Sequence, residues 1–115
     1  MKLAVLIAGL CLLATAASAE TIQPADASKN VGKPVTVEGV VNEVHHAASR
    51  KVIFINMGGQ YPNSPLTGVL FSSDAAKFPD VDSLQGKAVA LSGSITLYQG
   101  RAEIILSDPA QIKVK

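Results

Sequence analysis

The chain has 115 residues, a formal net charge of +1 at pH 7, one cysteine and no tryptophan. A chain so close to neutral has no long-range field to attract polyanions, which weighs against a purely electrostatic nucleic-acid binder. The single cysteine excludes a disulfide framework within the chain and a metal site built from several thiolates.

The first nineteen residues have the pattern of a secretory signal peptide. Lys2 is a short basic start, residues 3–13 are an apolar run, and residues 17–19 form a small-x-small cleavage site. We therefore expect residues 1–19 to be a signal peptide and residues 20–115 to be one exported domain, periplasmic or secreted, with no membrane span after cleavage.

Two other fates of this segment are open. A transmembrane anchor would need about 20 apolar residues, and the uncharged stretch 3–19 is shorter. A lipid anchor on Cys11 would need a small residue before the cysteine, where Leu10 stands. Cleavage would remove Lys2 and Cys11, leaving nine basic and nine acidic residues and no thiol.

The remainder of the chain is rich in strand patterns. A short helical segment is expected at 24–32, where a proline lies near the start and a glycine at the end. Five segments then have alternating or continuous apolar residues, which predicts strands; they are 34–46, 51–57, 66–72, 87–97 and 101–106. A second short helix, 73–78, lies between the third and fourth strands.

One pattern occurs twice, at 32–40 and 86–95. Each copy reads Gly-Lys, then alternating apolar positions, then a glycine inside the strand, which is Gly39 or Gly93. Such a glycine marks a bulge or bend, and a bulge is expected directly after Gly39, where Val40 and Val41 are both apolar. Two long bent strands suit a small, strongly curved barrel.

Element order and curvature together predict an all-β, five-stranded barrel of the OB type. The short helix between strands three and four would plug it, with Phe78 packed at the mouth. A small Greek-key sandwich is the alternative, but it would normally lack a helix at that point.

Several stretches resemble a known family. The Val-x-Gly-x-Val at 37–41 and the hairpin of strands four and five resemble bacterial OB domains of the anticodon-binding type. The stretches Phe-Ile-Asn-Met-Gly-Gly, Leu-Thr, Tyr-Gln-Gly-Arg-Ala-Glu-Ile and Pro-Ala-Gln-Ile, at 54–59, 66–67, 98–104 and 109–112, are similar to small non-catalytic OB domains of secreted bacterial proteins. Those domains sometimes accompany thermonuclease-like domains.

A second comparison is with secreted bacterial OB-fold stress proteins. These carry an aromatic-x-Phe-x-Asp segment in strand two, and Asn56 departs from that pattern.

No residue pattern predicts catalysis or a cofactor. Thermonuclease-like chemistry needs acidic metal ligands and two converging arginines, whereas this chain has only Arg50 and Arg101, in no matching acidic context. His45 and His46 are adjacent, so on a strand they would point to opposite faces and could not chelate one metal ion. Gly58-Gly59 lacks the lysine and helix of a phosphate loop. We therefore expect a non-enzyme without metal or cofactor.

The resemblance implies a ligand face on strands two and three, between the loops that join strands one–two and four–five. The candidate ligand-binding residues are Arg50, Lys51, Phe54, Asn56, Tyr98 and Arg101. An outward Phe54 would stack on a base of single-stranded nucleic acid, while the three basic residues contact phosphates with a log-affinity against log-salt slope of about −2. The alternative is that Phe54 is core and the basic residues are a solvated rim.

A second function is compatible with the same sequence. The loop 58–65 contains Tyr61 and two prolines, a stiff amphipathic surface that would suit another exported protein or the cell envelope. Electrostatics separates the two functions, because nucleic acid needs the basic rim to be free of acids. Glu43 and Glu103 lie close to that rim in sequence and would reduce its charge.

The signal-peptide pattern predicts a defined mature terminus. Protein recovered from the periplasm or the medium should have the intact mass of a chain that begins at Glu20. A recovered mass that still includes residues 1–19 would contradict cleavage.

Overall fold

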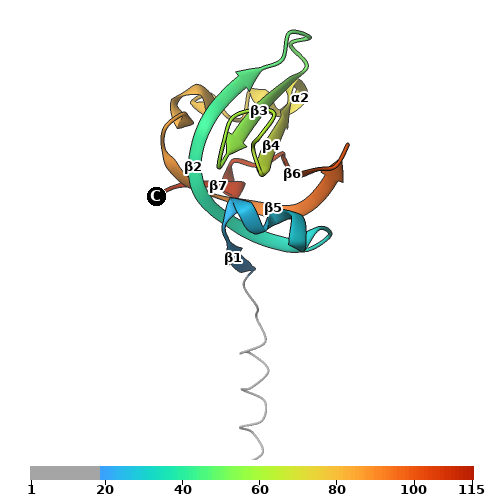
Figure 1. The fold of residues 1–115 in the computed structure, drawn as a ribbon. Coiled ribbons are helices and arrows are strands. Elements are labelled where there is room, and N and C mark those ends of the chain that lie inside the picture. Colours follow the sequence, from blue (N-terminus) through green and yellow to red (C-terminus); the bar gives the residue numbers. More distant parts are fainter. Residues whose placement is uncertain (1–18) are drawn as a thin grey trace, which may run out of the picture.

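The computed structural model describes residues 19–115, drawn in colour in Figure 1. The expected signal peptide, apart from Ala19, lies outside the described residues. Within 19–115, no helix is both long enough and apolar enough to cross a membrane.

Seven strands make up the sheet (Figure 1). They are β1 (Glu20–Ile22), β2 (Pro34–His46), β3 (Val52–Met57), β4 (Leu66–Phe71), β5 (Ala88–Tyr98), β6 (Arg101–Leu106) and β7 (Ile112–Val114). Five of them close into a ring in the order β2–β3–β4–β6–β5, because β5 also pairs with β2. The β4–β6 pair is parallel and the other four pairs of the ring are antiparallel. The predicted five-stranded OB barrel is confirmed.

Each of the two long strands pairs with two other strands of the ring, and additionally with β1 in the case of β2 and with β7 in the case of β5. Residues 34–40 of β2 pair with β5, and residues 41–46 pair with β3. Likewise, residues 88–94 of β5 pair with β2, and residues 95–98 pair with β6. Gly39 and Gly93 lie next to these changes of partner, as expected for strands that bend around a barrel.

The glycines permit close approach. A Cβ on Gly39 would lie 2.7 Å from Cγ of Pro24, and a Cβ on Gly93 would lie 2.7 Å from Cγ2 of Ile104. The predicted position of the bulge was wrong. The register shift falls between Val41 and Glu43, so Asn42 is the extra residue, beyond the Val40-Val41 pair.

Short helices close both ends of the barrel. At one end, the 3₁₀ helix η1 (Pro24–Asn30) buries Pro24 and Ala27, and Pro24 lies beside Gly58, just after β3. At the other end lie α2 (Ser72–Ala75) and the 3₁₀ helix η2 (Val81–Leu84). The backbone N–H of Ser72 donates to the carbonyl of Lys51, just before β3.

The predicted helix 73–78 is shorter than expected, and none of the four residues of α2 is buried. The apolar seal is made by the residues that follow it, namely Phe78, Val81 and Leu84, which all belong to the core cluster. Phe78 is 7% exposed, in agreement with the expectation that it packs at the barrel mouth.

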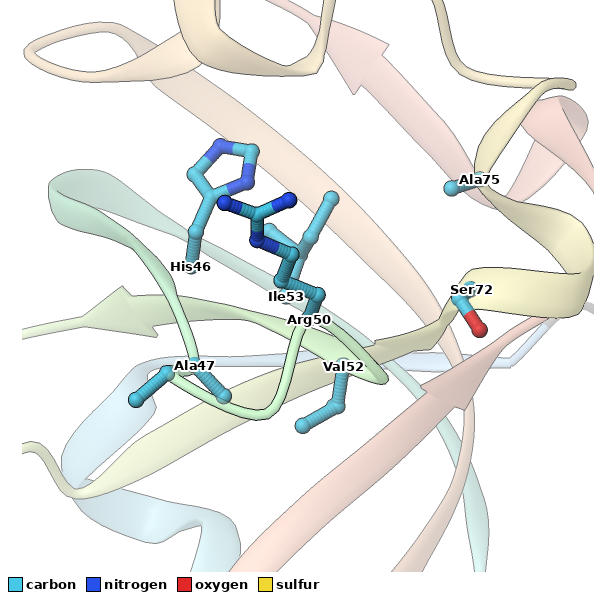
Figure 2. A pocket seen from close by; sticks show the side chains of 8 residues that line it. His46, Ala47, Arg50, Val52, Ile53, Ser72 and Ala75 are labelled. Atoms are coloured by element: carbon cyan, nitrogen blue, oxygen red, sulfur yellow. The ribbon is translucent and has the colours of Figure 1, made fainter.

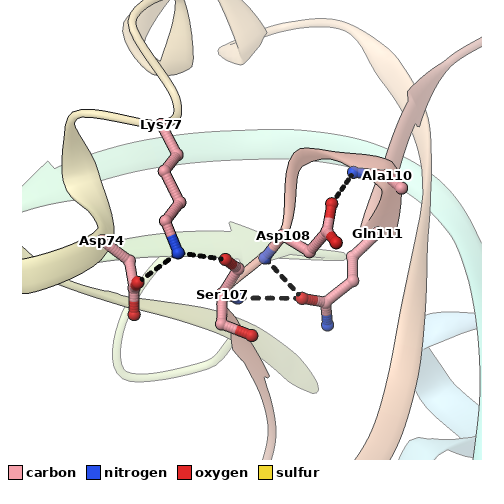
Figure 3. A network of polar contacts seen from close by, with 6 residues as sticks. All are labelled: Asp74, Lys77, Ser107, Asp108, Ala110 and Gln111. Atoms are coloured by element: carbon pink, nitrogen blue, oxygen red, sulfur yellow. Dashed lines mark hydrogen bonds and ion pairs between the residues drawn. The ribbon is translucent and has the colours of Figure 1, made fainter.

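Polar contacts tie α2 to the end of β6 (Figure 3). The Lys77 ammonium donates to Asp74 at 2.9 Å and to the carbonyl of Ser107 at 3.2 Å. Beyond β6, the Gln111 side chain accepts from the backbone N–H groups of Ser107 and Asp108, while Asp108 accepts from Ala110 N–H. This capping box starts the helical turn that leads into β7.

Phe78 provides a test of the barrel seal. Phe78→Ala should lower the free energy of unfolding by about 3–5 kcal/mol, because it leaves a cavity between η2 and the core. Urea denaturation of the purified domain measures this. Phe71→Ala is the matched control, since Phe71 is 45% exposed and should change stability little. A loss below about 1 kcal/mol for Phe78→Ala would contradict the seal.

Candidate ligand-binding site

A cavity of about 260 Å³ lies on the outer face of the barrel, over β3, β4 and β6. Nine residues line it: His45, Phe54, Asn56, Tyr61, Thr67, Tyr98, Gln99, Arg101 and Glu103. They come from all five strands of the ring, from the β3–β4 loop and from the turn of the β5–β6 hairpin.

Strand alternation explains why these side chains share a face. In β3, Ile55 and Met57 are fully buried in the core, so Phe54 and Asn56 point to the opposite side. The register places Asn56 between Glu43 on β2 and Thr67 on β4. Thr67 in turn pairs with Glu103 on β6, so one polar row crosses four strands.

A buried hydrogen-bond network forms the floor of the cavity. Asn56, which is 2% exposed, donates from Nδ2 to Glu43 Oε1 at 2.9 Å. Its Oδ1 accepts from Thr67 at 2.8 Å and from Ser64 at 3.3 Å. Glu43 Oε1 also accepts from the backbone N–H of Tyr61 at 3.3 Å. The network therefore joins the β3–β4 loop to the sheet and positions Tyr61.

Aromatic and cationic groups form the walls. The rings of His45 and Phe54 are stacked, with centroids 6.3 Å apart and planes at 14°. The Arg101 guanidinium lies 4.1 Å from the centroid of Tyr61, which is a cation–π contact across the cavity rim. Tyr98 is 59% exposed and pairs directly with Arg101 across the hairpin.

The hairpin turn has the backbone that a two-residue connection requires. Gln99 and Gly100 both have positive φ, 50° and 80°, which matches the type I′ turn favoured in tight hairpins. The turn sets Tyr98 and Arg101 side by side at the cavity rim.

The structure brings together some of the predicted site residues and separates others. Phe54, Asn56, Tyr98 and Arg101 all line the cavity, and Tyr61, which the sequence associated with a different function, joins them. Arg50 lines a second, more open hollow of about 560 Å³ at the α2 end of the barrel. Lys51 lines neither hollow.

Figure 2 shows Arg50 and His46 projecting into that second hollow, with Ile53 and Ser72 among its walls. His46 Nε2 is 2.6 Å from Asp82 Oδ1, so this histidine is held by η2. The three-residue basic rim expected from the sequence is therefore not assembled, and Arg101 is the only Lys or Arg among the cavity residues.

The residues predicted from the sequence did not include four that line the cavity, namely His45, Thr67, Gln99 and Glu103. Sequence reasoning did not single out Thr67, and it considered Glu103 only as a charge that weakens the rim. Alternation in β6 was a usable signal, because Ala102 and Ile104 are buried and Arg101 and Glu103 must then share the outer face.

Among the residues that line the cavity, Arg101 is the one arginine or lysine and Glu103 is the one acidic residue. Burial raises the pKa of the Glu103 carboxyl above its ordinary value, and the nearby Arg101 guanidinium opposes that rise. Within residues 19–115, no hydrogen bond or ion pair reaches the Glu103 carboxylate; only its backbone carbonyl accepts, from Thr96 at 3.4 Å. The described residues contain no group of three His, Cys, Asp or Glu side chains able to hold a metal ion.

Neither protein-family models nor curated proteins match the chain. Solved structures do. An OBody bound to hen egg-white lysozyme is 17% identical with a TM-score of 0.62, and the match covers 88% of this chain and 98% of the OBody. Asparaginyl-tRNA synthetase from Pyrococcus horikoshii is 17% identical with a TM-score of 0.61, covering 84% of this chain and 23% of the enzyme.

The synthetase from Entamoeba histolytica, in complex with asparaginyl-adenylate, gives 19% identity and a TM-score of 0.58 over 84% of this chain. The chain spans about a quarter of that enzyme's length, 24%. At such identities the likeness shows the OB fold alone.

The raised pKa of Glu103 predicts a pH-dependent stability. The pKa of the native carboxyl is raised above its ordinary value of 4.5, so the folded chain keeps this proton to a higher pH than the unfolded chain does, and stability falls as pH rises through the native pKa. Glu103→Gln should therefore raise Tm at pH 7, and the gain should disappear below about pH 4, where both forms are neutral. Scanning calorimetry across pH measures both.

Glu20→Gln is the control for this measurement, because Glu20 is exposed on β1. It should leave Tm nearly unchanged at either pH. A lower Tm for Glu103→Gln at pH 7 would show that the carboxylate is held by a stabilising partner.

Proposed function

We propose that residues 20–115 form an exported, non-catalytic OB-fold module that binds a short stretch of single-stranded nucleic acid in the Phe54 cavity. The observation that carries this proposal is the grouping of Phe54, Tyr98 and Arg101 around one hollow on the outer face of β3 and β4. The likeness to synthetases whose names record tRNA supports it at the level of the fold.

On this proposal, the cavity residues have different roles in binding. Phe54 is only partly buried, and its ring supplies a stacking surface for a base. Arg101 at the rim contacts a phosphate, while Asn56 has its oxygen fully engaged and shapes the floor. One phosphate contact predicts a log-affinity against log-salt slope of about −0.7, shallower than three contacts would give.

Export and the lack of catalysis are parts of the same proposal. The basic start, apolar run and cleavage site of residues 1–19 support export. The two histidines support a binding role, because His45 lines the aromatic cavity and His46 lines the other hollow, where Asp82 holds it. The module therefore has no shared histidine pair for acid–base or metal chemistry.

A protein partner is the second candidate function. Tyr61 is 62% exposed, and the β3–β4 loop that carries it is fixed to the sheet through Glu43. Glu103 adds a carboxylate to the same rim, which suits a cationic protein surface better than a phosphate chain. The likeness to a lysozyme-bound OBody is consistent with an OB barrel that docks on protein.

Fluorescence anisotropy with a labelled thymidine oligomer tests the first candidate. Phe54→Ala should weaken binding about 5- to 150-fold with little change in salt slope, because stacking is not ionic. Arg101→Ala should flatten the slope by about 0.7. Arg50→Ala is the matched control, since this arginine lines the other hollow, and it should bind as the wild type does.

Circular dichroism confirms that each variant is folded. Absence of binding at about 100 μM protein in about 50 mM salt would contradict the nucleic-acid function, because non-specific binders already reach this range at higher salt. The protein-partner function would then remain, with Tyr61→Ala as its first variant.

A further inference from the structure

The Glu103 carboxylate is the one acidic group among the residues that line the cavity, and nucleic-acid binding as proposed above gives it no role. It lines the cavity beside Phe54 and Arg101 and is partly buried. Among residues 19–115, nothing donates a hydrogen bond to its carboxylate, although Arg101 is two residues away on the same strand. An ionised carboxylate accepts hydrogen bonds only, so the occupant has to bring the donors.

We propose that Glu103 makes the cavity selective for guanine among the bases of a single strand. This inference rests on the proposed nucleic-acid function and specifies which base the cavity takes.

The Watson–Crick edges of the bases explain the choice. Guanine presents two adjacent donors, N1–H and the N2 amino group, which match the two oxygens of a carboxylate. Adenine and cytosine place a ring-nitrogen acceptor beside their amino group, and thymine or uracil flanks its single N–H with two carbonyls. In each of these bases, an acceptor faces a carboxylate oxygen and repels it. Unstacked bases of single strands are read on these edges.

The strand register leaves room for one base between the Phe54 ring, on which the base would stack, and the Glu103 carboxylate, which would accept its hydrogen bonds. Phe54 is on β3 and Glu103 is on β6, on either side of β4, and Glu103 is in register with Asn56, two residues along from Phe54. Two strand spacings across the sheet and two residues along it place the two positions roughly 12 Å apart. Thr67 on β4 lies between Asn56 and Glu103 in the polar row, and its side chain is short and only 4% exposed. A base that stacks on Phe54 therefore extends over β4 toward the carboxylate.

Neighbouring polar groups leave the carboxylate free for a ligand. Thr67 and Asn56 are hydrogen-bonded to each other at 2.8 Å. Arg101 lies over the ring of Tyr61 and forms no ion pair with Glu103. Loss of the carboxylate charge in acid removes one of the two acceptor oxygens, so the preference for guanine should weaken as pH falls.

Labelled oligonucleotides of about seven nucleotides, with thymidine throughout except at the centre, test this inference. The central base is guanine, hypoxanthine, adenine, cytosine or thymine. Guanine should bind about tenfold more tightly than thymine, as expected for a good bidentate contact. Hypoxanthine lacks the N2 amino group and should lose most of that gain.

Two variants test whether Glu103 causes the preference for guanine. Glu103→Gln should abolish the difference between guanine and thymine, because the amide lacks the paired acceptor oxygens that bind guanine and the charge that repels the thymine carbonyls. Circular dichroism shows that the variant is folded. Glu38→Gln is the control. Glu38 lies on another part of β2, where it forms an ion pair with Lys115, and it does not line the cavity. The Glu38→Gln variant should retain the full preference.

The outcomes separate this inference from the proposed function. If the all-thymidine oligomer binds but guanine binds no more tightly, the guanine preference is wrong and the nucleic-acid function stands. A guanine preference that survives Glu103→Gln also overturns the role of Glu103. If no oligomer binds, the proposed function fails and the inference fails with it.

Discussion

The pairing of β2 with β5 is the constraint on which the rest of this structure depends. It joins the first and fourth strands of the ring over seven residue pairs, from Pro34 with Ser94 to Val40 with Ala88. Because each strand then leaves its partner for another neighbour, both must bend, and a Cβ at Gly39 or Gly93 would strike an atom 2.7 Å away. Closure thus determines which side chains face outward on β3, β4 and β6, and so it creates the cavity.

Sequence patterns predicted most of this fold because its signals are local. Alternation located the five ring strands, and glycines inside two of them indicated the bends. The bulge at Asn42 was misplaced because two adjacent valines are a local cue, whereas the register depends on β3. The three-residue strands β1 and β7 carry too few residues for any period, and their pairing with β2 and β5 is a tertiary event.

The residues of the cavity were predicted in part, because only some of them follow from local sequence signals. Phe54 and Asn56 followed from alternation in β3, and Tyr98 and Arg101 from the hairpin. Arg50 is close to Phe54 in sequence, but its positive φ of 62° belongs to a turn at the α2 end, where it lines the other hollow. Thr67 and Glu103 become neighbours only through the parallel pairing of β4 with β6, which no sequence period specifies.

On the proposed function, this cavity would let a nearly neutral chain select a ligand without a long-range field. Its one arginine is already placed over Tyr61, and its unpaired carboxylate is partly buried, where burial raises its pKa and opposes folding at neutral pH. Because no side chain of residues 19–115 pairs with this carboxylate, it is available to the donors of a ligand. On the proposed function, specificity would depend on cavity groups at short range and affinity on stacking, so the weak net charge of the chain is compatible with selective binding.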